Sequence, residues 1–257
     1  MRLFLTRKMK EEVIMKRFTI TCVLVLFLTT IIFSTGLAQT SEEIVAKMIE
    51  AQGGKAALEK VKDMTYTGTI DIISYGITGS MTMYLKEPDK ARMDMEFMGM
   101  VMTQAFDGEN AWGLDPNTGS IVDMPEDQAK ELKRMAIGNS ALLHPEKHGI
   151  TFTFKGKETI EGKDYILLEQ AYDDGHKETL YLDAGTYLVH KTKSMSTDLT
   201  GISVETEAYA SDYRKVDGLM LWHSMRIVQE GEEAMVMNFT EVAINTGLED
   251  SLFRKED

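Results

Sequence analysis

The sequence predicts a mainly β protein of the α+β class, in which one large antiparallel sheet curves into an incomplete barrel. Three observations predict this fold class. Apolar and polar residues alternate with a period of two through most of the chain after residue 63, as in strands with one buried and one wet face. Turn signals such as Asp107-Gly108 and Asp217-Gly218 separate these stretches. Helical spacing is confined to two short regions.

The alternation is clearest in the first predicted strand, residues 64–72, where apolar side chains alternate with Thr and Asp. Residues 77–86 and 91–97 repeat the pattern with Met and Phe on the apolar side. The other stretches with strand character are residues 101–106, 111–114, 150–155, 165–170, 178–183, 187–194, 203–209, 220–228 and 234–242. About eleven meandering strands are typical of a large curved sheet or an incomplete barrel.

Two regions are predicted to be helical. The first begins at Thr40, which has the spacing of a capping box with Glu43, and ends before residues 53–54, a Gly-Gly pair. Residues 56–61 can add further turns.

The second helix follows Pro125 and has acidic residues in its first turn. Its apolar stripe includes Leu132, Met135 and Ala136, which an amphipathic helix must lay on the apolar face of the sheet. We predict that these three residues cover that face, either as a permanent part of the core or as a movable lid.

The composition excludes several classes of protein. The 257 residues carry a formal net charge of −13, with 43% hydrophobic and 27% charged residues. This balance is that of a globular protein, and it excludes intrinsic disorder, a collagen-like repeat and a multi-pass membrane protein. A strongly acidic chain is a poor binder of phosphates, so we expect no nucleic-acid partner.

Residues 1–38 are predicted to be a cleaved secretory signal peptide. A short basic stretch precedes an uncharged run from Phe18 to Phe33, and the small residues Gly36 and Ala38 follow. Cleavage after Ala38 leaves a single domain, residues 39–257.

Two alternatives for this first segment stay open. In the first alternative, the apolar run is retained as a membrane anchor, although it is short for a membrane span of about 20 residues. In the second, translation starts at Met15 instead of Met1. Cleavage removes Cys22, the single Cys of the chain, and leaves no disulfide or thiol nucleophile.

Methionine is unusually frequent, with 19 residues in the chain. Strand cores normally favour β-branched and aromatic side chains, whereas Met is unbranched and adapts to varied apolar partners. A concave sheet face covered with Met suits a flexible acyl chain, and ordinary core filling is the alternative. The candidate residues for the lining of such a cavity are Met81, Met83, Met93, Met95, Phe97, Met235, Met237 and Phe239.

No pattern of residues indicates catalysis or metal binding. His144 and His148 have the spacing of two helical metal ligands, but Pro145 lies between them and no third ligand is near in sequence. The chain lacks the nucleophile elbow, the phosphate-binding loop and the dinucleotide fingerprint. We therefore predict no enzyme activity, no cofactor and no metal.

Several short motifs resemble those of a known family. Residues 85–92 place a Pro-containing turn before a strand that begins near Arg92, and residues 106–112 contain Asp-Gly followed by Trp112. Residues 212–218 form a further match late in the chain. In these motifs and in the order of its elements, the chain resembles the periplasmic lipoprotein carriers of the LolA/LolB type and the broader group of outer-membrane lipoprotein-sorting proteins.

The resemblance implies an unclosed antiparallel β-barrel with helices covering its concave face. It also implies a periplasmic carrier that shields the acyl chains of lipoproteins, or another lipid, and that meets membrane-bound donor and acceptor proteins. The alternative function is a non-catalytic envelope sensor or scaffold domain that binds a protein partner.

Overall fold

The computed structural model describes residues 39–115, 118–198 and 201–255, and residues Thr40–Asp257 form one compact unit. The predicted signal peptide lies outside the described residues and stays a prediction. Among the residues described, no helix has the length and apolar character needed to cross a membrane.

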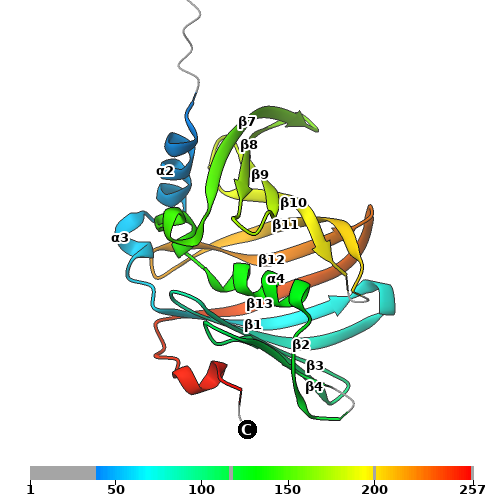
Figure 1. The fold of residues 1–257 in the computed structure, drawn as a ribbon. Helices are drawn as coiled ribbons and strands as arrows, with labels where there is room; N and C mark the ends of the chain where they lie inside the picture. Colours follow the sequence, from blue (N-terminus) through cyan, green and yellow to red (C-terminus); the bar gives the residue numbers. More distant parts are fainter. Residues whose placement is uncertain (1–38, 116–117, 199–200, 256–257) are drawn as a thin grey trace, which may run out of the picture. The chain divides into compact units, whose positions relative to one another are not determined.

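The strands of the described residues form one antiparallel sheet of thirteen strands. Their order in the sheet is β6-β5-β4-β3-β2-β1-β13-β12-β11-β10-β9-β8-β7, so that β1 pairs with β13 and the edge strands β6 and β7 stay unpaired with each other (Figure 1). Their bounds are β1 Asp63–Ile72, β2 Ile77–Lys86, β3 Lys90–Phe97, β4 Met100–Phe106, β5 Ala111–Leu114, β6 Ile121–Asp123, β7 Thr151–Ile160, β8 Lys163–Ala171, β9 Lys177–Asp183, β10 Val189–Thr197, β11 Ser203–Val216, β12 Leu219–Gln229 and β13 Glu232–Ile244.

The mainly β, unclosed antiparallel fold predicted from the sequence is confirmed. The estimate of about eleven strands was low, although the predicted stretches correspond to twelve of the thirteen strands. Strand β6 was missed because its three residues are too few to show an alternating pattern.

The helices are short, and α2 and α4 begin where the sequence predicted them. Thr40 caps α2 through a capping box, with its hydroxyl accepting from the Glu43 amide at 3.2 Å. Gly138 follows α4 with a positive φ, and a further short helix, α5, begins after it. The bounds are α2 Ser41–Ala51, α3 Lys55–Leu58, α4 Glu126–Ala136 and α5 Ser140–Leu143, with single 3₁₀ turns η1 Ile73–Tyr75, η2 Pro145–His148 and η3 Asp250–Phe253.

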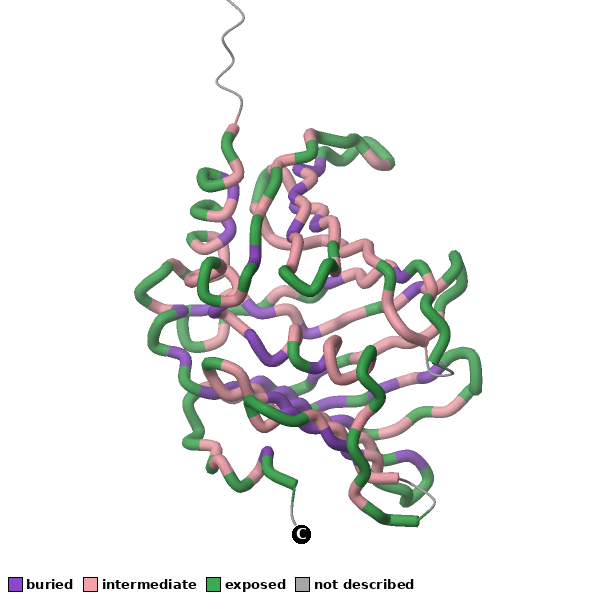
Figure 2. Tube along the Cα trace, in the orientation of Figure 1, coloured by how far each residue is buried: buried purple, intermediate pink, exposed green. Residues whose placement is uncertain are grey.

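The helices α2 and α4 cover the same face of the sheet, which we call the inner face. Directly paired residues of neighbouring strands point to the same side, so the strand register traces this face from β8 to β3. Ile44 and Met48 of α2 pack on it over β8 and β9. Leu132 of α4 packs on it over β3 and β4. Figure 2 shows the resulting alternation of buried and exposed positions along many strands.

The sheet curves strongly around α4. This helix contacts β3, β4 and β5 and also contacts β10, although five strands separate β3 from β10 in the sheet. At about 4.8 Å per strand these two strands would lie about 29 Å apart in a flat sheet, whereas a helix is only about 10 Å wide. Curvature therefore turns the inner face into a concavity that α4 occupies (Figure 1).

A β-bulge and a glycine fix the pairing of β1 with β13. The register shifts between Thr67 and Gly68, which allows Phe239 and Val242 to be buried on the same side although they are three residues apart. A Cβ atom on Gly68 would lie 2.0 Å from the carbonyl oxygen of Asn238. Only glycine fits this close approach of two backbones.

The C-terminal turn η3 packs on the opposite, outer face. Phe253 is fully buried there, and its carbonyl accepts from Nε1 of Trp112 at 2.8 Å. Arg92 donates to the carbonyl of Leu252 at 2.8 Å and forms an ion pair with Asp94 at 3.0 Å. Two residues that carry the resemblance, Arg92 and Trp112, therefore hold the C-terminal segment.

Candidate functional site

The structure brings the eight predicted cavity residues together in one apolar cluster on the inner face. Met81 lies opposite Met95, and Met83 lies opposite Met93. Four of the eight are buried (Met81, Met83, Phe97 and Phe239), and four are partly buried and packed against them (Met93, Met95, Met235 and Met237).

An apolar cavity of about 280 Å³ lies beside this cluster, between the sheet and the junction of α4 and α5. Of the eight predicted residues, Met83 lies in its wall. The wall further includes Tyr66 and Trp222, whose rings stack with centroids 5.4 Å apart. Burial raises the pKa of the Tyr66 hydroxyl, which keeps this group neutral. The cavity thus presents aromatic and thioether surface without charge.

Small side chains on β11 leave this space open. Ala208 and Ala210 lie on the inner face, opposite Ile227 and Met225 of β12. Both alanines and Met225 are in the cavity wall. Methyl groups cannot fill the volume that larger side chains occupy in the neighbouring strands. These alanines are not among the predicted cavity residues, which are all large, although the alternation of Ala208 and Ala210 around Tyr209 is a usable signal in the sequence.

The three residues of the predicted lid lie over β3 and β4. Leu132 and Ala136 are buried against Ala91 and Phe106. Met135 contacts that group and the Met-rich cluster as well. The stripe of α4 therefore lies on the inner face, beside the apolar cavity.

The α4–α5 junction is attached to the turn between β2 and β3. The amide of Asn139 donates to the Glu87 carboxylate at 2.8 Å. Burial raises the pKa of Glu87, and this amide and that of Ser140 partly offset the rise. The side-chain Nδ2 of Asn139 is buried and has no hydrogen-bond partner among the described residues. Asn139 is also a residue of the cavity wall, which places this unsatisfied donor beside the cavity.

A row of polar residues crosses the otherwise apolar inner face. Five directly paired positions on β8 to β12 form it, and we call it the polar row: Gln170, Glu178, Ser194, Thr206 and Gln229. The neighbouring positions toward the cavity are Leu168, Leu180, Thr192, Ala208 and Ile227. Burying a polar group without a hydrogen bond costs free energy, so we expect the residues of the polar row to have hydrogen-bond partners.

Internal hydrogen bonds satisfy much of the polar row. Gln170 donates to the Tyr172 hydroxyl at 2.6 Å, and this hydroxyl donates to Glu178 at 2.9 Å. The hydroxyl groups of Ser196 and Thr206 lie 2.6 Å apart.

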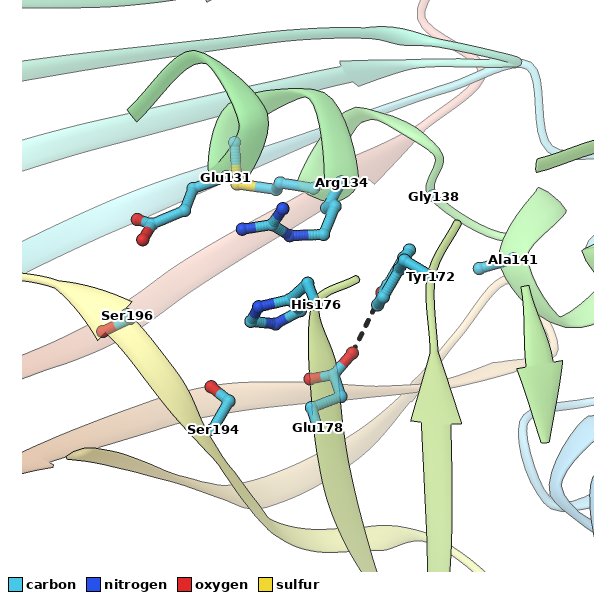
Figure 3. Close-up of a pocket in the computed structure, with 10 residues that line it drawn as sticks. Glu131, Arg134, Gly138, Ala141, Tyr172, His176, Glu178, Ser194 and Ser196 are labelled. Carbon is cyan, nitrogen blue, oxygen red and sulfur yellow. Dashed lines mark hydrogen bonds between the residues drawn. The ribbon is translucent and has the colours of Figure 1, made fainter. Parts of the chain in front are cut away.

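Two residues of the polar row, Glu178 and Ser194, form the floor of a second pocket of about 380 Å³ under α4 (Figure 3). We call it the polar pocket. Arg134 of α4 lies in its wall, where it forms an ion pair with Asp174 at 2.6 Å and covers the Tyr172 ring at 5.8 Å. Glu131 accepts from the Thr197 amide at 2.7 Å.

Burial dominates the ionisation of the groups in the polar pocket. It raises the pKa of Glu178, while the Tyr172 hydroxyl and Arg134 act in the opposite direction. Burial also lowers the pKa of His176, and the nearby Arg134 lowers it further, so the imidazole is neutral at pH 7. The pocket is therefore rich in hydrogen-bonding groups and poor in net positive charge.

The two histidines considered as metal ligands have different partners in the structure. His148 lies 2.7 Å from the Ser140 hydroxyl, and His144 lies 3.8 Å from Glu146. Within the part of the chain that the structure describes, no three His, Cys, Asp or Glu side chains gather in a way that could hold a metal ion.

Solved structures share this architecture. A domain from Vibrio parahaemolyticus named for outer membrane lipoprotein sorting matches with a TM-score of 0.57 and 17% identity, over 83% of this chain and 95% of that chain. A LolA superfamily protein from Nitrosomonas europaea matches with a TM-score of 0.59 and 14% identity, over 85% and 99%. A DUF1329 family protein from Desulfovibrio piger matches with a TM-score of 0.57 and 14% identity, over 84% and 98%. No family model and no curated protein sequence matches the chain.

The chain therefore has the fold of the LolA superfamily and of outer membrane lipoprotein-sorting domains. The resemblance drawn from the residues around Pro88, Arg92 and Trp112 is confirmed at the level of the fold. On this fold, the chain combines an apolar cavity with a neighbouring polar pocket, and both lie on the inner face.

Proposed function

We propose that this protein is a periplasmic carrier that shields acyl chains in the apolar cavity and takes part in the sorting of outer-membrane lipoproteins. The observation that carries the proposal is an uncharged cavity, walled by Met and aromatic side chains, on the inner face of a LolA-like sheet. The proposal assigns no catalytic step to the protein. It includes export by the segment 1–38, which is cleaved after Ala38.

The chemistry of the cavity wall supports a hydrocarbon ligand. Each CH₂ group that leaves water contributes about 0.8 kcal/mol, so an acyl chain gains much from even a small apolar cavity. Met side chains can rearrange as the chain enters, because they have several rotatable bonds and no branch. The Met-rich cluster beside the cavity, with Met81, Met93 and Met95, is proposed to move in this way.

The two tryptophans of the chain provide a direct test. Trp222 lies in the cavity wall, whereas Trp112 donates to the Phe253 carbonyl on the outer face. Bromine atoms on an acyl chain quench tryptophan fluorescence at short range. We expect brominated stearate to quench the delipidated variant Trp112→Phe, which retains Trp222, and to leave the variant Trp222→Phe unquenched.

Native mass spectrometry of the purified protein serves as the second measurement. Co-purified lipid that disappears on delipidation supports the proposal. Equal quenching of both variants, or the absence of quenching together with the absence of bound lipid, contradicts it.

The proposal also includes a membrane-bound acceptor protein. The strand register places the β1–β2, β3–β4 and β10–β11 turns at one end of the sheet (Figure 1). Exposed apolar side chains gather at these turns, namely Ile73, Tyr75, Met98, Met100, Val101, Met195 and Ile202. Exposed carboxylates lie among them, for example those of Glu96 and Glu232. Acidic groups are repelled by an anionic membrane surface, so a protein with an apolar, basic docking surface fits this end better than a lipid bilayer does.

A further inference from the structure

The polar pocket has features that an apolar acyl chain cannot use. It adjoins the apolar cavity, because Gly138 at the end of α4 lies in the wall of both. Glu178 and Ser194 of the polar row form its floor, whereas the neighbouring strand positions toward the cavity include Leu180 and Ala208. A purely hydrocarbon ligand would place these polar groups against apolar surface without hydrogen-bond partners, and burying them in this way is energetically unfavourable.

Two hydrogen-bonding groups remain unused near this boundary. The buried Nδ2 of Asn139 has no partner in the described part of the chain. The hydroxyl of Ser194 points into the polar pocket in Figure 3, next to Glu178, and no side-chain partner is seen for it among the described residues. One group is therefore a donor at the cavity wall, and the other is a donor and acceptor in the floor of the polar pocket.

The charges around the polar pocket select against an anionic ligand. The positive charge of Arg134 is already compensated by Asp174, while Glu131 and Glu178 have no ion-pair partner among the described residues. The other titratable groups that face the pocket are Tyr172 and His176, which burial keeps neutral. An anionic headgroup would therefore meet two carboxyl groups without a free cation.

We propose that the ligand is an acyl ester with an uncharged, hydroxyl-bearing headgroup, as in a monoacylglycerol or another glyceride. The hydrocarbon tail occupies the apolar cavity, the Asn139 side chain turns toward the cavity so that Nδ2 donates to the ester carbonyl, and the headgroup hydroxyls bind Ser194 and Glu178. This inference rests on the proposed carrier function and adds the chemical class of the headgroup.

The experiment compares five probes of equal chain length by displacement of a fluorescent acyl probe. These are monoolein, methyl oleate, oleate, oleylamine and 1-octadecene. We expect monoolein to bind about tenfold more tightly than methyl oleate, because methyl oleate has the ester and lacks the hydroxyl groups. Oleate should bind more weakly than monoolein at pH 7, and 1-octadecene should bind most weakly.

Two variants assign the contacts. Ser194→Ala should weaken monoolein about fivefold and leave methyl oleate unchanged, whereas Asn139→Leu should weaken both esters and leave 1-octadecene unchanged. Ser80→Ala, on the exposed side of β2, is the matched control and should change neither. The Asn139→Leu variant without ligand should be at least as stable as wild type, since the substitution removes a buried donor that has no partner.

The outcomes separate this inference from the carrier function. Equal affinity of the protein for monoolein, methyl oleate and oleate would overturn the headgroup assignment while leaving the carrier function intact. Tighter binding of oleylamine than of monoolein would overturn it as well and would indicate a cationic headgroup. If no probe binds, including 1-octadecene, the carrier function itself fails.

Discussion

At the scale of single residues, Asp183 shows how one carboxylate stabilises the turn after β9. Partial burial alone would raise its pKa, but hydrogen bonds from Lys163 and from the amides of Thr186 and Gly185 lower the pKa to about 2. The folded protein therefore binds the proton less readily than the unfolded chain, whose value is near 3.8. This stabilisation is fully present above the unfolded pKa and is lost as the pH falls through about 2.

We predict that Asp183→Asn lowers the free energy of unfolding by about 1 kcal/mol at pH 7, because Lys163 is largely exposed and screened by solvent. The difference between variant and wild type should shrink between pH 4 and pH 2, as measured by urea denaturation. Asp217→Asn, at an exposed turn, is the control and should show no such trend. A difference that stays constant down to pH 2 would contradict the assignment.

The stability of the fold does not explain why Met occupies position 98. The Met98 side chain is 88% exposed. With φ values of 53° and 84°, Met98 and Gly99 form a two-residue hairpin turn, a type of turn that favours Asn-Gly. We predict that Met98→Asn raises the free energy of unfolding by about 0.5 kcal/mol, measured by urea denaturation. Met100→Thr, on the adjacent strand position, serves as a comparison without a change at the turn. A loss of stability in Met98→Asn would show that the Met98 side chain has a packing role.

At the scale of elements, local patterns predicted most helices and strands. The Thr40–Glu43 capping box and the alternation in β1 to β3 depend on neighbouring residues, so they can be recognised in the sequence. Helix α5 was missed, because its four residues are too few to show a helical period. The polar row was missed for a different reason. Its members lie on five strands, and only the register brings them together.

The pairing of β1 with β13 depends on a close approach at Gly68. We predict that Gly68→Ala lowers the free energy of unfolding by about 3 kcal/mol, because the added methyl group would overlap the backbone of Asn238. Thr69 is the exposed neighbour on the same strand, and Thr69→Ala should lower the free energy of unfolding much less. Equal melting temperatures for the two variants would show that the β13 backbone can move away without loss.

At the scale of the whole molecule, long-range contacts set the position of the site. Strand β1 pairs with β13 across most of the chain, and α4 joins distant parts of the sheet. Glu131 of α4 accepts from the Thr197 amide on β10, while Leu132 packs on β3 and β4. The sequence predicted the apolar stripe of α4, but it gave no information on this bridging position. The Met residues on β2, β3 and β13 pack into one cluster, yet the open space lies next to small residues on β11.

In the proposed carrier, the residues that bind the acyl chain lie apart from the residues that contact the acceptor protein. The cavity wall contains Met64 and Leu85, which lie near the end of the sheet opposite the exposed turn of Met98. We predict that the double variant Met98→Asn and Met100→Thr binds an acyl probe with unchanged Kd. Its transfer of that probe to native outer-membrane vesicles should be several-fold slower, because the apolar docking surface is reduced. Transfer to protein-free liposomes of the same lipids should keep the wild-type rate, since the acceptor in the proposal is a protein. Equal slowing of transfer to both kinds of vesicle would indicate instead that these side chains contact the lipid bilayer. An unchanged transfer rate with both would show that the turn of Met98 and Met100 is not part of the docking surface.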